Sequence, residues 1–151
     1  MKGEIKLQDY LKEIQRETAS WPGVTASPHR FGGIEFNLGK AEIGHIHRDG
    51  TLDIPLPRKI RDQLLLEGLV EKHHFLPDSG WITFNVRSDS DLSRAVWLLR
   101  LSYLRYVLRK RSSVQSVSRN PEGLEELRSL NLSPGLAAAF AQVTKGLAKA
   151  G

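Results

Sequence analysis

The sequence contains no cysteine. Disulfides, thiolate metal ligands and a cysteine nucleophile are therefore excluded. The sequence also lacks a Gly-x-Ser-x-Gly elbow and a phosphate-binding glycine loop, so neither serine hydrolase chemistry nor ATP chemistry is indicated. No apolar run approaches a membrane span, and residues 1–21 carry too many charges for a signal peptide. We expect a cytoplasmic protein with no membrane contact.

Hydrophobic residues make up 40% of the 151 residues, which is enough for one sizeable core. The formal net charge of +5 is compatible with an anionic partner such as nucleic acid. The densest basic run is Arg109-Lys110-Arg111, at the expected end of a long helix, where cations complement the helix dipole. Because no aromatic residues are interleaved with this run, nucleic-acid binding is an alternative and not the main expectation.

Residues 43–56 form the most regular stretch, with apolar and polar residues alternating on either side of Arg48-Asp49-Gly50. This pattern predicts a β-hairpin. A three-residue loop with its glycine in the left-handed conformation would pair His45 with Asp53 and place both on one face. A two-residue loop would place His45 opposite Ile54 and separate the imidazole from the carboxylate.

The other patterns indicate an α+β fold, in which an antiparallel meander of about four to five strands packs against helices. We expect strands at 24–28, 31–38, 41–47, 51–55 and 81–86, and helices at 7–20, 57–67, 88–109, 121–130 and from Ser133 onward. The strand at 81–86 either forms a further hairpin with the segment at 70–76 or is preceded by a loop. We predict a core domain at residues 1–110, a Ser-rich linker at 111–121 and a helical C-terminal extension at 122–151.

The helix at 88–109 carries two adjacent apolar stripes, which is more than one core face needs. The second stripe includes Trp97, Leu101 and Leu104. It is either covered by another part of this chain or held for a partner, such as a second copy in a homodimer. We expect the last helix to dock on Trp97 and Leu101 through a stripe that includes Leu136 and Phe140; a mobile tail is the alternative.

All five histidines lie in the first half of the chain, at positions 29, 45, 47, 73 and 74. If the strand at 81–86 pairs beside the meander, the segment that carries His73 and His74 can reach the face of the central hairpin. Together these groups would form a polar pocket rimmed by Trp81 and Phe75.

A metal site is a second interpretation, because His-x-His on a strand places two imidazoles on one face. Gly39, followed after five residues by His45-Ile46-His47, matches the start of the cupin metal motif. The glutamate that this motif requires three or four residues later is missing, since Thr51 and Leu52 stand there. We therefore expect no metal.

Several short motifs follow one another along the chain in an order and spacing that resemble the luciferase-domain family, which contains the fungal luciferases and many uncharacterised prokaryotic proteins. They are Phe31-Gly32-Gly33-Ile34-Glu35-Phe36, Glu42-Ile43-Gly44-His45-Ile46-His47, Leu52-Asp53-Ile54-Pro55-Leu56-Pro57, Arg61-Asp62, His73-His74, Asp78-Ser79-Gly80-Trp81 and Leu98-Leu99-Arg100-Leu101-Ser102-Tyr103. The resemblance covers about residues 21–106.

The resemblance implies an oxidoreductase that lets molecular oxygen react with an electron-rich enolic or aromatic, luciferin-like substrate, without metal, flavin or any other cofactor. Such a reaction needs a base that ionises the enol, a dry pocket and donors that stabilise the developing negative charge. From the residues themselves, we predict catalytic roles for His45 as the base, Asp53 as its orienting partner and His47 as a donor. The predicted substrate-binding residues are His73, His74, Trp81 and Phe75.

More weakly, the order of the elements is similar to the small YjbR-like domains, an α+β fold linked with nucleic-acid binding. This similarity implies an alternative function, a non-catalytic module that binds nucleic acid or protein through its basic C-terminal helix. The histidines would then be structural.

Overall fold

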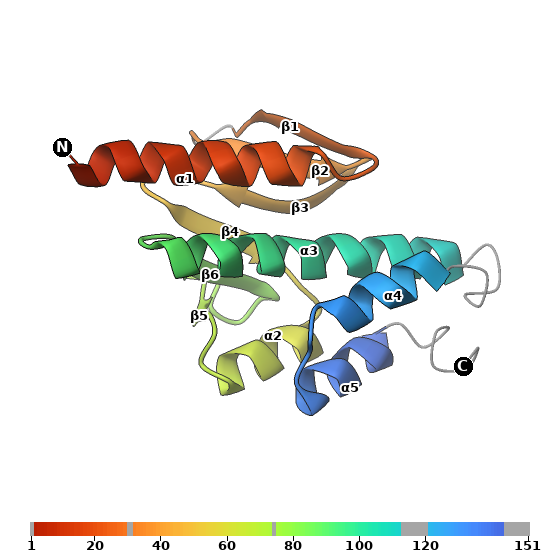
Figure 1. Ribbon diagram of the computed structural model, residues 1–151. Coiled ribbons are helices and arrows are strands. Elements are labelled where there is room, and N and C mark those ends of the chain that lie inside the picture. Colours follow the sequence, from red (N-terminus) through yellow and green to blue (C-terminus); the bar gives the residue numbers. More distant parts are fainter. Residues whose placement is uncertain (1, 30–31, 74, 113–120, 144–151) are drawn as a thin grey trace.

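The computed structural model describes residues 2–29, 32–73, 75–112 and 121–143 (Figure 1). In this part of the chain, a six-stranded antiparallel sheet has the order β1-β2-β3-β4-β6-β5. Its strands are β1 (Val24–Pro28), β2 (Ile34–Leu38), β3 (Ala41–Ile46), β4 (Thr51–Pro55), β5 (Glu71–Lys72) and β6 (Trp81–Asn85). The predicted α+β class and the antiparallel meander are confirmed, and the sheet has one strand more than expected because the short β5 adds to its edge.

Two long helices cover one face of this sheet (Figure 1). Helix α1 (Lys2–Ala19) packs on β1 and β2, and helix α3 (Asp89–Ser112) packs on β3 and β4 and against α1. Strand residues that point toward these helices are apolar and fully buried, as in Phe36, Leu52 and Ile82. The opposite face of the sheet, called the open face below, carries the polar side chains.

The central hairpin has the first of the two predicted registers. His45 pairs with Asp53 and Ile46 with Leu52. The His47 N–H donates to the Thr51 carbonyl at 2.8 Å, and Gly50 adopts a φ of 92°. A left-handed glycine in this position closes a three-residue loop and leaves the imidazole and the carboxylate on the same face.

The helix starts agree with their capping signals. Ser88 Oγ accepts the Asp91 N–H at 3.2 Å, and the Asp91 carboxylate accepts the Arg87 N–H at 2.9 Å. This reciprocal pair fixes the start of α3 at the serine cap. Ser133 Oγ likewise accepts the Leu136 N–H at 3.0 Å at the start of α5 (Pro134–Val143).

The C-terminal helices pack on the rest of the chain. Helix α5 lies against α2 (Arg58–Leu66), whereas α4 (Pro121–Ser129) lies against α3. Trp97 donates its indole N–H to the Leu130 carbonyl at 3.0 Å, so the contact with Trp97 comes from the turn after α4. Leu136 and Phe140 are buried, but the main neighbour of the last helix is α2, whereas the prediction placed it on Trp97 and Leu101 of α3.

The apolar stripe of α3 is therefore covered within this chain, since Leu101 and Leu104 are buried. Dimer formation and the division into core, linker and extension stay predictions, and residues 113–120 of the linker lie outside the described residues. Among the described helices, none combines the length and the apolar character needed to cross a membrane.

Candidate functional site

A row of polar residues crosses the open face of the sheet. The strand registers pair Glu35 with His45, His45 with Asp53, and Asp53 with Thr83. Directly paired residues on neighbouring strands lie on the same face and within contact distance. The row therefore places an imidazole, two carboxylates and a hydroxyl next to one another on rigid backbone.

A β-bulge adds a further carboxylate to this row. Phe36 pairs with Gly44 and Asn37 with Glu42, so Ile43 has no partner in the register. The extra residue lets Ile43 point into the core, where it is fully buried, while Glu42 and His45 both point to the open face. The Glu42 Oε2 atom consequently lies 2.6 Å from His45 Nδ1.

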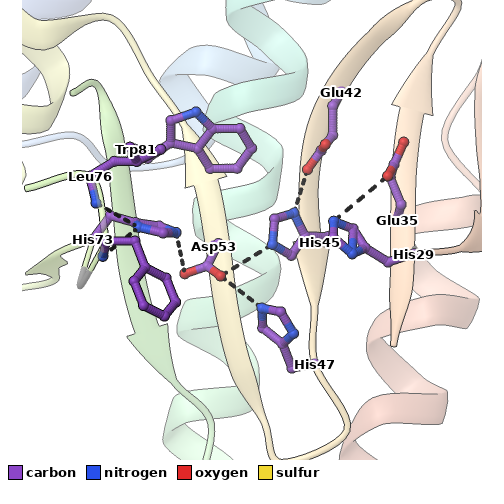
Figure 2. Close-up of a pocket in the computed structure, with 10 residues that line it drawn as sticks. His29, Glu35, Glu42, His45, His47, Asp53, His73, Leu76 and Trp81 are labelled. Carbon is purple, nitrogen blue, oxygen red and sulfur yellow. Dashed lines mark hydrogen bonds and ion pairs between the residues drawn. The ribbon is translucent and has the colours of Figure 1, made fainter. Parts of the chain in front are cut away.

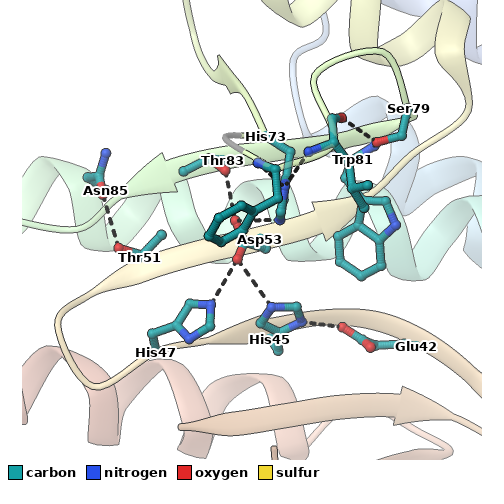
Figure 3. A network of polar contacts seen from close by, with 12 residues as sticks. Glu42, His45, His47, Thr51, Asp53, His73, Ser79, Trp81, Thr83 and Asn85 are labelled. Carbon is teal, nitrogen blue, oxygen red and sulfur yellow. Dashed lines mark hydrogen bonds and ion pairs between the residues drawn. The ribbon is translucent and has the colours of Figure 1, made fainter. Parts of the chain in front are cut away.

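Asp53 is the centre of the polar contacts (Figure 3). Its Oδ2 atom lies 2.9 Å from His47 Nε2 and 3.2 Å from His45 Nε2. Its Oδ1 atom accepts the Thr83 hydroxyl at 2.7 Å and lies 3.7 Å from His73 Nε2. The side chain of Asp53 is only 1% exposed, so these groups replace the water that would otherwise solvate the carboxylate.

These contacts determine the charges of the site in the metal-free protein. Burial opposes the charged forms of both His45 and Asp53, but their hydrogen bonds outweigh it. Asp53 and Glu42 raise the pKa of His45 to about 9, and contacts from His45, Thr83 and His47 lower the pKa of Asp53. Both ring nitrogens of His45 thus donate to carboxylates at neutral pH. His45 is thus placed to donate protons in this state, and its role as the base stays a prediction.

His73 approaches Asp53 from the loop after β5. Its Nδ1 atom accepts the backbone N–H groups of Phe75 and Leu76, each at 3.2 Å. Because Nδ1 is an acceptor, the ring proton lies on Nε2, the nitrogen nearer to Asp53. Figure 2 shows His73 opposite His45 across Asp53, with the Trp81 ring above them.

Three contacts hold the loop that precedes Trp81. Ser79 Oγ accepts the Trp81 N–H at 3.1 Å, and Arg61 of α2 donates to the Ser79 carbonyl at 2.6 Å. Gly80 passes so close to Leu56 that a Cβ atom would lie 2.1 Å from the Leu56 carbonyl oxygen. The loop is therefore fixed from both sides, and the Trp81 ring stands 5.5 Å from that of His45.

These groups enclose a pocket of about 770 Å³ on the open face (Figure 2). Its polar floor is the row described above, and its apolar wall contains Trp81 together with the exposed side chains of Phe75 and Leu76. The full lining is His29, Glu35, Glu42, His45, His47, Asp53, His73, Phe75, Leu76 and Trp81. A volume of this size suits a small organic ligand.

The structure thus brings six of the predicted site residues to one pocket, namely His45, Asp53, His47, His73, Trp81 and Phe75. The seventh, His74, lies outside the described residues. Their assigned roles in catalysis and substrate binding stay predictions.

The sequence prediction did not include Glu35, Glu42, Leu76 or His29 in the site. His29 lies at the end of β1, and its ring is 4.0 Å from the His45 ring, centroid to centroid. Burial and the neighbouring charge of His45 lower the pKa of His29. No sequence pattern marks His29 as a site residue; the pairing of β1 with β2 carries it to the pocket edge.

Two overlapping groups among the described residues have a metal-ligand composition. One consists of His45, His47 and Asp53, and the other of His29, Glu42 and His45. Within each group, the candidate ligand atoms lie within 4.8 Å of one another.

Residues 40–102 match the model of the luciferase domain. This segment of the chain is similar to the luciferase domain. The match confirms the family resemblance read from the sequence motifs, and within the pocket lining only His29 and Glu35 lie outside the matched segment. No curated protein and no solved structure matches the chain.

Proposed function

We propose that this protein binds a small, planar enolic or aromatic molecule in the open-face pocket and acts on it as an oxygenase. The observation that carries the proposal is the pocket itself, because the segment that matches the luciferase domain supplies almost its whole lining. The expected substrate class is that of luciferin-like enols.

The two sides of the pocket fit such a molecule in different ways. The Trp81 ring offers a flat apolar surface on which a planar ring can stack, with Phe75 beside it at the rim. The imidazole groups of the floor can exchange hydrogen bonds with an enol hydroxyl or a carbonyl. A substrate held between them has its polar edge toward Asp53 and its ring partly shielded from water.

An enol becomes reactive toward oxygen when it loses its proton, so the site must accept a proton and stabilise negative charge. His45 has both ring nitrogens engaged by carboxylates, so we assign it a part in the polar floor as a donor. His47 is the most exposed of the histidines bound to Asp53, at 28% of its side chain. When its Nε2 donates to Asp53, its Nδ1 is left as an acceptor, so we assign His47 as the group that takes the enol proton.

The test uses 3-hydroxyhispidin, an enol-pyrone, with the full chain. We expect saturable quenching of tryptophan fluorescence, followed by oxygen uptake and light emission. Trp81→Ala should weaken binding by roughly 3- to 10-fold, the value of an aromatic contact of about 0.5–1.5 kcal/mol. Trp97→Phe is the matched control, because Trp97 contacts Leu130 at α4 and is absent from the pocket lining.

Each outcome separates binding from reaction. Quenching that does not saturate would reject the pocket as a site for this substrate class. Saturable binding without oxygen uptake would keep the binding site and reject the oxygenase. Turnover that persists in His45→Ala would show that the reaction does not depend on the polar floor.

The nucleic-acid alternative rests on Arg109, Lys110 and Arg111. Their side chains lie outside the described residues, so that alternative stays a prediction. Retention on DNA or RNA that weakens as salt increases would support it.

A further inference from the structure

We propose that His45 Nε2, His47 Nε2 and Asp53 Oδ2 form a binding site for a divalent first-row transition metal, with iron(II) as its expected occupant. The proposal goes beyond the proposed function, because it concerns the protein without any organic ligand. It rests on four features of the cluster: its spacing, its donor types, its outer contacts and its position in the pocket.

Asp53 Oδ2 lies at the spacing of neighbouring ligands on one ion from both imidazole nitrogens. Asp53 Oδ2 lies 2.9 Å from His47 Nε2 and 3.2 Å from His45 Nε2. With metal–ligand bonds of about 2.1 Å, adjacent ligand atoms are about 3 Å apart in an octahedron and about 3.4 Å apart in a tetrahedron. Both imidazole nitrogens thus lie at ligand spacing from Asp53 Oδ2, and the candidate ligand atoms of the three residues lie within 4.8 Å of one another.

The donor types select the class of metal. Two imidazoles and one carboxylate on one side of an ion are typical of non-haem iron(II) oxygenases, which keep their other positions open. Here both histidines come from one strand and its turn, and the aspartate comes from the strand paired with it. The cupin motif does not continue in this sequence, because its glutamate is missing; here the carboxylate comes from Asp53 on the paired strand.

The outer contacts are those that orient ligands in metal sites, where a bound histidine usually donates its second N–H to a carboxylate. His45 Nδ1 faces Glu42 Oε2 at 2.6 Å. The second oxygen of Asp53 accepts the Thr83 hydroxyl at 2.7 Å, so one oxygen is left for the ion. The β-bulge turns Glu42 to the open face and so places the carboxylate that would orient His45.

The second candidate group, His29, Glu42 and His45, fits an ion less well. Glu42 Oε2 and His45 Nδ1 are 2.6 Å apart, which is closer than adjacent ligands on one ion and is the distance of a strong hydrogen bond. We therefore assign Glu42 to the outer contacts and leave His29 outside the site.

The position of the cluster leaves room for a ligand on the ion. All three residues line the floor of the pocket of about 770 Å³, below Trp81 (Figure 2). An ion at this place would present its open positions to any molecule held in the pocket.

The test measures metal binding by the chelator-treated full chain without substrate. Cobalt(II) reports its surroundings through visible absorption, and zinc(II) binding is measured by calorimetry; both are expected to saturate at one ion per chain. Iron(II), added without oxygen, should compete with cobalt. Bound metal should also raise the midpoint of thermal unfolding.

Variants locate the site. His47→Ala and Asp53→Asn should each weaken binding by more than the roughly 10- to 100-fold expected for the outer-contact variant Glu42→Gln. His29→Ala separates the two candidate groups, because it should weaken metal binding less than His47→Ala does. His47 lies at the strand end and is partly exposed, so His47→Ala remains informative if Asp53→Asn does not fold.

Three results would overturn the proposal. They are the absence of saturable binding in the wild type, unchanged binding in His47→Ala, and a loss in His29→Ala as large as that in His47→Ala. None of them concerns the organic substrate, so a failure here leaves the proposed function standing. Conversely, metal binding without turnover of the enol-pyrone would support this site alone.

Discussion

Asp53 shows how a buried carboxylate is stabilised in this fold. An unpaired carboxylate inside a protein is strongly unfavourable, and Asp53 is only 1% exposed. Two imidazoles approach one of its oxygens and the Thr83 hydroxyl donates to the other. The buried charge of Asp53 is therefore stabilised by the two imidazoles and the hydroxyl together, and each of these donors contributes to the stability of the sheet.

Removing the hydroxyl donor tests this dependence. Thr83→Val keeps the shape of the side chain but leaves Asp53 Oδ1 without its 2.7 Å contact, and we expect a loss of about 1–3 kcal/mol in unfolding free energy. Urea unfolding measures it. Thr51→Val is the control on the same pair of strands, because the 3.4 Å contact between Thr51 and Asn85 is partly exposed. Equal effects of the two variants would contradict a special role of the buried donor.

At the scale of elements, the bulge in β3 decides the composition of the site. In a regular strand, Glu42 and His45 would point to opposite faces, because side chains alternate. The unpaired Ile43 shifts this alternation and brings both residues to the pocket. Gly44 permits the arrangement, since its strand passes directly under the Leu99 side chain of α3.

A methyl group at Gly44 should disturb this contact. A Cβ atom there would lie 2.7 Å from Leu99 Cδ2 and 3.2 Å from Ile54 Cγ1, so we expect Gly44→Ala to cost about 1–3 kcal/mol. The double variant with Leu99→Ala tests the cause. If the clash with Leu99 is responsible, Gly44→Ala costs less in that background than in the wild type. Additive losses would place the cause elsewhere.

The contact between α1 and the start of α3 gives a prediction for alkaline pH. Tyr10 donates its hydroxyl to Asp89 Oδ1 at 2.6 Å, and this hydrogen bond, with burial and the nearby negative charges, raises the pKa of Tyr10 to about 12. The folded state thus favours the neutral ring. Its contribution to stability is complete below the ordinary tyrosine pKa near 10 and is lost as the pH rises from about 10 to 12.

Ultraviolet titration of the tyrosinate band measures this step. We expect the wild type to show a tyrosine that ionises near pH 12, and Tyr10→Phe to lack it. Asp89→Asn should lower the pKa of Tyr10 toward its ordinary value, since the charged acceptor is gone. A titration curve in which Tyr10→Phe removes only an ordinary step near pH 10 would contradict the assignment.

The sequence predicted those parts of the site that depend on local geometry. The glycine of the Arg48-Asp49-Gly50 loop was enough to favour the register that pairs His45 with Asp53. Glu42 was missed because nothing in the alternation of residues 41–47 marks a bulge. His29 was missed because its position depends on how β1 and β2 pair, which is a property of the whole sheet.

At the scale of the whole molecule, the pocket draws on more of the chain than the segment that matches the luciferase domain. That segment spans residues 40–102, whereas α1, β1 and β2 precede it and α5 follows it. β1 and β2 bring His29 and Glu35 to the pocket, and α5 covers α2. Because α2 supplies the Arg61 contact that holds Ser79, the C-terminal helix supports the wall of the pocket through α2.

Phe140 allows this connection to be tested. It is fully buried between the C-terminal helix and the rest of the core, so we expect Phe140→Ala to lower the unfolding free energy by about 3–5 kcal/mol. Amides of residues 136–143 should be protected from hydrogen exchange in the wild type and lose protection in the variant. Phe75→Ala is the control, because that ring is 79% exposed and its removal should leave stability within about 0.5 kcal/mol. Exchange of these amides at unfolded rates in the wild type would show that α5 is not part of the folded unit.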